Sequence, residues 1–116
     1  MKYLLLLYGD AVAEAAMTAD ERRAMVEEHI RFSRYLDERN ARVLGEALGE
    51  ASGARTISFS NGGVPIVTDG PFLEAKESLG GFYVLDCEGP DEAIELAKGL
   101  PRSPGLVAEL RPIVDA

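Results

Sequence analysis

Six stretches of apolar or alternating residues predict six β-strands. The first expected strand covers residues 2–8, in which residues 3–8 are all apolar. Residues 81–87 are apolar on both faces of another expected strand. Strands of this type are usually buried on both sides. The remaining expected strands cover residues 42–50, with a kink at its glycines, and residues 56–60, 64–68 and 106–114. The sequence Asn61-Gly62-Gly63 predicts a hairpin between the third and fourth strands.

Two amphipathic stretches predict helices. Thr18 and Glu21 have the spacing of a capping box, so we expect a helix over residues 19–39 after a loop at residues 9–17. Its apolar arc includes Met25, Val26, Ile30, Phe32 and Leu36. His29 and Ser33 fall in the middle of this arc and should face the sheet. A second helix is expected to begin at Pro90 and to end near Gly99.

The predicted order is β-α-β-β-β-β-α-β, which indicates an α+β fold. Split β-α-β units of this kind form an antiparallel sheet with both helices on one face, the ferredoxin-like arrangement. Residues 1–116 are expected to form a single domain. Two helices cover only one face of strands that are apolar on both faces. We therefore expect a second copy to cover the other face, giving a homodimer with a barrel-like interior.

Composition narrows the classes of partner. The formal net charge of −8 argues against nucleic acid or an anionic membrane surface as a partner. Cys87 is the single cysteine, which excludes an internal disulfide and suits the reducing cytoplasm. The apolar run at residues 3–8 is too short for a signal segment or a membrane span. One His and one Cys predict no metal site, and no glycine-rich loop predicts a nucleotide cofactor.

A longer motif runs from Val67-Thr68-Asp69-Gly70-Pro71-Phe72 through Glu74, Lys76-Glu77 and Leu79-Gly80-Gly81-Phe82. With residues 91–94 and 109–113, it resembles the YCII-related family, in the subgroup named for its Asp-Gly-Pro-Phe motif. The resemblance implies a dimeric α/β barrel of ferredoxin-like subunits. Some relatives carry a His–Asp pair proposed as catalytic, and one is a dehydrochlorinase acting on a chlorinated muconolactone. Members of the subgroup are often linked to extracytoplasmic-function sigma factors.

Carried over to this chain, the motif acid is Asp69, and His29 resembles the first-helix histidine of the wider family. The resemblance makes these two residues the candidate catalytic pair, with His29 as base and Asp69 as its orienter. Arg111 is a candidate clamp for an anionic substrate group, and Tyr8 and Ser33 are candidate substrate-binding residues. Each has a structural alternative: a satisfied buried histidine, an aspartate that starts a turn, or an ordinary ion pair.

Two functions therefore remain open from the sequence. The first is a cofactor-free enzyme that performs lyase- or isomerase-like acid–base chemistry on a small carbonyl or lactone acid. The alternative is a non-catalytic dimer that binds a small ligand or regulates a partner such as a sigma factor. The sequence does not decide whether the protein is an enzyme.

Overall fold

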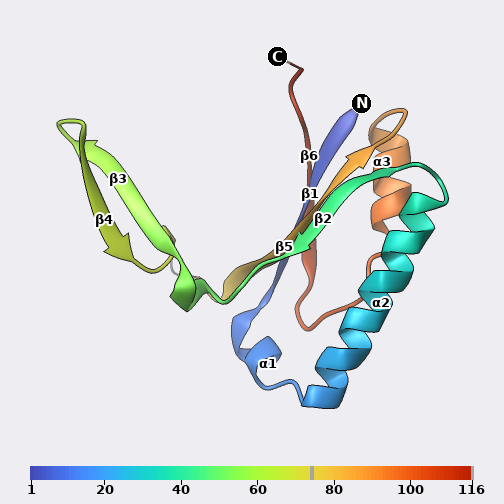
Figure 1. The fold of residues 1–116 in the computed structure, drawn as a ribbon, viewed down its shortest axis with the longest axis horizontal. Helices are drawn as coiled ribbons and strands as arrows, with labels where there is room; N and C mark the ends of the chain where they lie inside the picture. The colour runs from blue at the N-terminus through green and yellow to red at the C-terminus, as the bar shows by residue number, and fades with distance from the viewer. Residues whose placement is uncertain (74, 116) are drawn as a thin grey trace.

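The computed structural model describes residues 1–73 and 75–115, and it confirms an α+β, ferredoxin-like fold. Four antiparallel strands form the main sheet in the order β2-β5-β1-β6 (Figure 1). Their bounds are Lys2–Asp10 for β1, Arg42–Ala47 for β2, Glu77–Asp86 for β5 and Val107–Pro112 for β6. The helices are α1 at Ala11–Ala15, α2 at Ala19–Asp37 and α3 at Pro90–Ala97.

The core lies on one face of this sheet. Alternate residues of β1 and β5 are buried there against α2 and α3, so both long helices cover the same face as predicted. Leu5, Leu36 and Leu85 are the largest side chains that are fully buried in this core. Leu4, Leu6, Phe82 and Val84 point to the opposite face, where Leu4 is opposite Val84 and Leu6 is opposite Phe82. These four side chains are partly buried.

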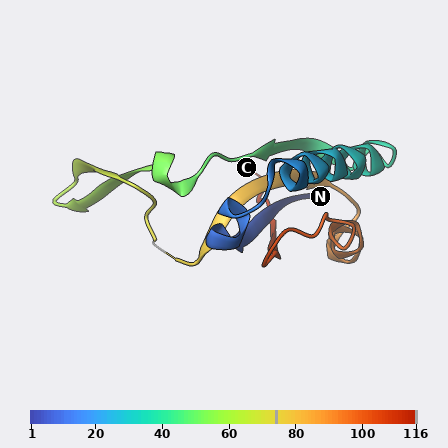
Figure 2. The ribbon, with the colours of Figure 1, turned by 90° about the horizontal axis from the view of Figure 1, so that it is seen from below.

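The third and fourth strands leave the main sheet. β3 (Arg55–Asn61) and β4 (Val64–Asp69) pair only with each other, and they project away from the helices (Figures 1 and 2). A short 3-10 turn, Ala51–Gly53, precedes β3. The predicted hairpin turn is confirmed, because Gly62 and Gly63 adopt φ angles of +62° and +83°. One face of the hairpin carries hydroxyl side chains, so it has little apolar surface to contribute to the core.

Several boundaries differ from the sequence prediction: the strand expected over residues 42–50 ends at Ala47, and two helical boundaries also change. Part of the expected loop at residues 9–17 forms α1, because the Asp10 carboxylate accepts hydrogen bonds from the backbone of Val12 and Ala13 and caps a helical turn. Helix α2 begins at the predicted capping box but ends at Asp37, and Asn40 with φ of +54° then turns the chain into β2. Within the described residues, the structure contains no helix long and apolar enough to cross a membrane.

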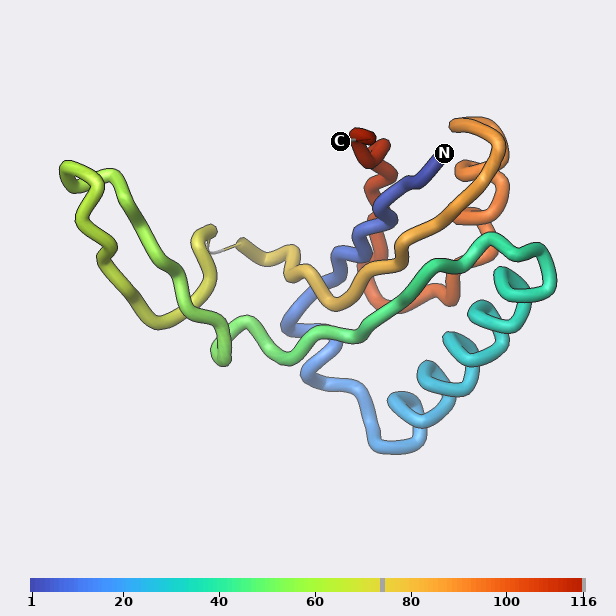
Figure 3. The backbone as a smooth tube through the Cα atoms, turned by 45° about the horizontal axis from the view of Figure 1, so that its top comes forward, coloured from blue at the N-terminus to red at the C-terminus, as the bar shows by residue number. Residues whose placement is uncertain are grey.

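The chain is flat and extended for its length. Its principal extents are 47, 42 and 17 Å, and its radius of gyration is 16.1 Å. A compact chain of this length has a radius of gyration of about 13 Å. The tube in Figure 3 shows the reason, since the β3–β4 hairpin stands apart from the body that the other elements form. Many apolar side chains of the chain are therefore exposed.

Candidate functional site

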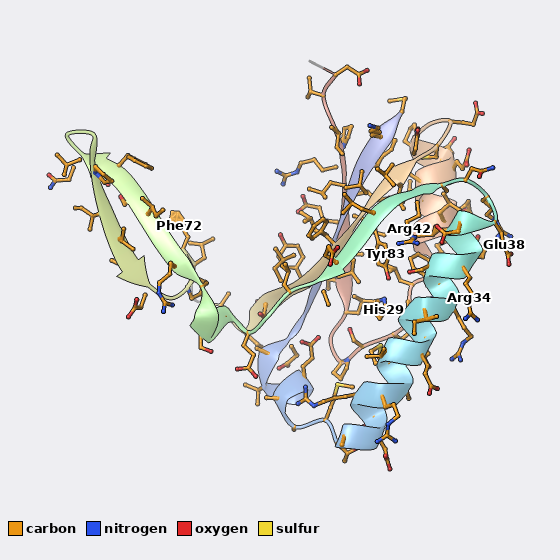
Figure 4. All side chains as sticks on the ribbon, in the orientation of Figure 1. His29, Arg34, Glu38, Arg42, Phe72 and Tyr83 are labelled. Atoms are coloured by element: carbon orange, nitrogen blue, oxygen red, sulfur yellow. The ribbon has the colours of Figure 1, made fainter. Side chains whose placement is uncertain are left out.

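Helix α2 presents His29 to the sheet, as the periodicity predicted. The capping box at its start is complete: the Thr18 hydroxyl accepts from the Glu21 N–H, and the Glu21 carboxylate accepts from the Thr18 N–H. The capping box fixes the start of the helix, which places Phe32 and Leu36 in the core and leaves His29 half-buried beside them. The Nδ1 atom of His29 lies 2.7 Å from the hydroxyl oxygen of Tyr83 on β5. Figure 4 shows both side chains between α2 and the sheet.

Tyr83 is held in place from several sides. Its ring meets the ring of Phe32 edge to face, with centroids 5.2 Å apart and an interplanar angle of 83°. Gly45 is opposite Tyr83 in the β2–β5 pairing. A Cβ atom on Gly45 would lie 2.5 Å from Cδ1 of the Tyr83 ring. The ring therefore occupies the space above Gly45, and the glycine is required for this position of the hydroxyl.

Burial keeps both partners uncharged near neutral pH. Burial lowers the pKa of His29 below that of a free imidazole. The negative charge of the nearby Glu28 acts in the opposite direction, but its effect on this pKa is smaller. Burial also raises the pKa of Tyr83, against a hydrogen bond with Ser33 and the positive charge of Arg42. The site therefore holds a neutral imidazole and a neutral phenol in one short hydrogen bond. Either group can be the donor, and the choice determines which imidazole nitrogen carries the proton.

A cavity of about 660 Å³ opens beside this pair, between α2 and strands β1, β2 and β5. Much of its wall is apolar, with Leu7, Met17, Met25, Val26, Ile30 and Leu106 among the lining residues. His29, Ser33, Tyr83 and Tyr8 add polar groups, so two of the three predicted substrate-binding residues line the cavity. A volume of this size suits a small organic molecule.

Charged side chains at the rim are largely paired. Arg42 donates two hydrogen bonds of 2.8 Å to the Asp37 carboxylate, and this contact lowers the pKa of Asp37. Arg22 donates to the carbonyls of Glu14 and Ala15 at the end of α1. Burial raises the pKa of Glu14, and the Asp10 charge adds to this effect. The cavity therefore carries no strong excess of either charge.

The other two predicted residues lie outside this cavity. Asp69 is at the end of β4, where its side chain is 89% exposed and its Oδ1 atom lies 3.1 Å from Nε of Arg55. Arg111 is on β6 and forms an ion pair of 2.6 Å with Glu109. The chain thus pairs His29 with Tyr83, and Asp69 with Arg55. It does not bring His29 and Asp69 together. In Figure 4, the labelled Phe72, which follows Asp69 by three residues, lies far from His29.

The turn after Asp69 closes the base of the hairpin. Gly70 has a φ of +95°, a left-handed conformation that glycine adopts without strain. Its N–H donates to the Ala54 carbonyl at 2.8 Å, and its carbonyl accepts from the Thr56 hydroxyl at 2.8 Å. The aspartate carboxylate itself pairs with Arg55 across the two strands. This geometry accounts for residues 69 and 70 as structural elements of the turn.

Sequence reasoning missed three features of the site: the direct contact of Tyr83 with His29, the close packing of Gly45 under the ring, and the place of Glu14 in the wall. Tyr83 and His29 are 54 residues apart, so no local pattern connects them. A glycine opposite an aromatic residue is a usable signal only once the strand register is known. No group of three or more His, Cys, Asp or Glu residues able to hold a metal ion occurs in the part of the chain that the structure describes.

Comparisons with known proteins agree with this fold. The sequence profile of the YCII-related domain matches residues 1–115. The chain is also similar to an uncharacterised protein of Rhizobium meliloti (strain 1021), with 34% identity over 100 residues. That alignment covers 86% of this chain and 80% of the relative. Neither match specifies an activity.

Proposed function

The chain belongs to the family of YCII-related domains, and on that premise we propose that it is a small acid–base enzyme whose base is His29. The observation that carries the proposal is the contact of 2.7 Å between His29 Nδ1 and the Tyr83 hydroxyl at the wall of the cavity. A base near neutral pH must be both unprotonated and accessible. The lowered pKa of His29 meets the first condition, because the imidazole is neutral.

The second condition depends on the other imidazole nitrogen. Among the described residues, Tyr83 is the one hydrogen-bond partner found for the ring, and no buried side-chain nitrogen lacks a partner. Nε2 is therefore accessible. When Nδ1–H donates to the Tyr83 oxygen, Nε2 carries the free lone pair. Tyr83 then performs the orienting role that a carboxylate has in other sites, and its own O–H stays available to a substrate oxygen.

In the proposed reaction, Nε2 takes a proton from a carbon next to a carbonyl group. The electron pair of that C–H bond forms an enolate or expels a leaving group from the neighbouring carbon. The imidazolium then returns its proton to the product or to water. The apolar wall excludes water from the enolate, and the Tyr83 O–H can donate to its oxygen. A small carbonyl or lactone acid, the substrate class that the resemblance implied, fits the volume and the mixed lining of the cavity.

Other parts of the sequence hypothesis remain proposals. We propose membership of the Asp-Gly-Pro-Phe subgroup on the sequence of residues 69–72, and a cytoplasmic location on the single cysteine. Asp69 can join His29 only from a second copy, because one chain keeps the two residues apart. Arg111 likewise acts as an anion clamp only if an assembly brings it to a cavity.

Proton abstraction is testable without knowledge of the natural substrate. Muconolactone and levulinic acid are incubated with the protein in D2O, and loss of the signals from protons next to the carbonyl is followed by proton NMR. We expect the wild type to exchange these protons faster than His29→Gln. Tyr83→Phe keeps the ring but removes the hydroxyl, so it should give an intermediate rate.

The single histidine also reports binding directly. The ¹H–¹⁵N imidazole signals of His29 are recorded with and without each compound. Exchange no faster than in buffer, together with signals that do not move, would count against the enzyme and favour the non-catalytic module. Signals that move without exchange would retain the cavity as a ligand site and remove the catalytic role.

A further inference from the structure

Arg22 connects the two N-terminal helices at the wall of the cavity, where α1 lies beside the start of α2 (Figure 1). Its Nη2 atom donates hydrogen bonds of 3.0 and 3.2 Å to the carbonyl oxygens of Glu14 and Ala15. Carbonyl groups are neutral, so these bonds hold the guanidinium in place without cancelling its positive charge. A guanidinium has five N–H donors, so Nε and Nη1 keep theirs for another acceptor.

The positive charge of Arg22 has no carboxylate partner in the part of the chain that the structure describes, whereas Arg42 at the same cavity is paired with Asp37. The Glu14 side chain shares the α1 end of the wall, but its carboxyl packs against Gly9, where a Cβ atom would collide with Oε1. Burial raises the pKa of Glu14 and favours its neutral form, although the charge of Arg22 acts in the opposite direction. Arg22 is therefore a fixed cation that is still able to bind an anion.

Helix geometry places Arg22 in line with His29. The two residues are seven positions apart on α2, which is almost two complete turns, so they share one face of the helix. Their separation along the helix axis is about 10 Å. Met25 and Val26 lie between them and also line the cavity. Along this wall, α2 thus presents a cation, then an apolar stretch, and then the proposed base.

We propose that Arg22 binds the carboxylate of the substrate, and that an apolar chain joins this carboxylate to the carbon that reacts at His29. The inference rests on the proposed function of His29 and names the substrate class for that site. Hydrogen bonds between a guanidinium and a carboxylate are charge-assisted and strong. A short acid such as levulinic acid cannot span about 10 Å, so it reaches His29 or Arg22 but not both.

Arg34 is the other arginine of the cavity wall that has no ion pair among the described residues. It follows His29 by five positions, which corresponds to a rotation of about 140° around the helix axis. Arg34 therefore lies on a different side of α2 from the line that joins Arg22, Val26 and His29. This placement favours Arg22 as the anion site.

A matched pair of ligands tests the proposal. 7-Oxooctanoic acid and 2-octanone have the same number of carbon atoms and the same methyl ketone, and they differ in the carboxylate. Their dissociation constants are measured by titration of the protein, followed through the imidazole signals of His29 and the backbone amide signals. We expect the wild type to bind the acid at least about 10-fold more tightly than the ketone. It should also bind this acid more tightly than levulinic acid.

A matched pair of substitutions assigns the effect to one residue. Arg23 is the neighbour of Arg22, but it is exposed, pairs with Asp20 and does not line the cavity. Arg22→Gln and Arg23→Gln each remove one positive charge. We expect Arg22→Gln to bind the acid no more tightly than the ketone, with ketone binding unchanged, and Arg23→Gln to keep the wild-type preference. Arg22→Lys keeps the charge but loses the planar group, so it should retain part of the preference.

Four results would overturn the proposal. They are equal binding of acid and ketone by the wild type, equal losses in Arg22→Gln and Arg23→Gln, weaker binding of both ligands in Arg22→Gln and in Arg22→Lys, and loss of the preference in Arg34→Gln instead. The exchange assay is a separate measurement. Exchange that depends on His29 without a preference for the acid would support the proposed function and reject the anion site. A preference for the acid without exchange would support the anion site and reject the catalytic role.

Discussion

Replacement of Gly45 by alanine tests how tightly the site is packed. The added Cβ would lie 2.5 Å from Cδ1 and 2.6 Å from Cε1 of the Tyr83 ring. Carbon atoms in contact are normally about 3.5–4.0 Å apart, so the ring must retreat by about 1 Å. Phe32 blocks one direction, and the hydrogen bond to His29 restrains the hydroxyl. Gly45→Ala should therefore displace Tyr83 and lengthen or break that hydrogen bond.

The size of the effect follows from three contributions. Overpacking of a well-packed site costs about 1–3 kcal/mol. Loss of a hydrogen bond adds about 1 kcal/mol. Alanine in place of glycine offsets about 0.4–1 kcal/mol of this, by restricting the unfolded chain. We expect a net loss of about 1–3.5 kcal/mol in the free energy of unfolding. With an unfolding entropy of about 2.1 cal/mol/K per residue, each kcal/mol lowers Tm by about 4 °C.

Gly49 provides the control, because a Cβ at that position would meet nothing within 4 Å. Gly49→Ala should leave stability unchanged or raise it by up to about 1 kcal/mol. Both variants are unfolded in urea at one protein concentration, and the imidazole signals of His29 are recorded for each. If Gly45→Ala matches Gly49→Ala in stability and the His29 signals stay at their wild-type positions, the packing argument is refuted.

Two further predictions concern helix α2. Burial lowers the pKa of His29 in the folded state, so below the unfolded value of about 6.5 the unfolded chain binds more protons. The wild type should therefore lose stability relative to His29→Gln as pH falls from 7 to 5, and parallel urea curves for the two proteins over this range would contradict the assignment. Thr18→Ala removes the hydroxyl of the capping box and should cost about 1 kcal/mol, measured by thermal unfolding; Thr18→Ser should restore most of it.

The sequence alone determined most of the fold, because its signals are local. The spacing of Thr18 and Glu21 placed the start of α2, and the 100° periodicity turned His29 and Ser33 towards the sheet. Gly62 and Gly63 marked the hairpin turn that the structure contains. The order of strands and helices indicated the ferredoxin-like arrangement. Each of these features depends on backbone preferences or on periodicity within a few residues.

Only the tertiary structure decided the composition of the site. Which residue meets His29 depends on the register of β5 against β2 and on where α2 crosses the sheet, and these bring Tyr83 to it across 54 residues. The same register places Gly45 under the ring. Asp69 could be recognised as the acid of a motif, but its distance from His29 depends on the departure of β3 and β4 from the main sheet. Long-range packing, which no local pattern encodes, therefore made Tyr83 rather than Asp69 the partner of His29 within one chain.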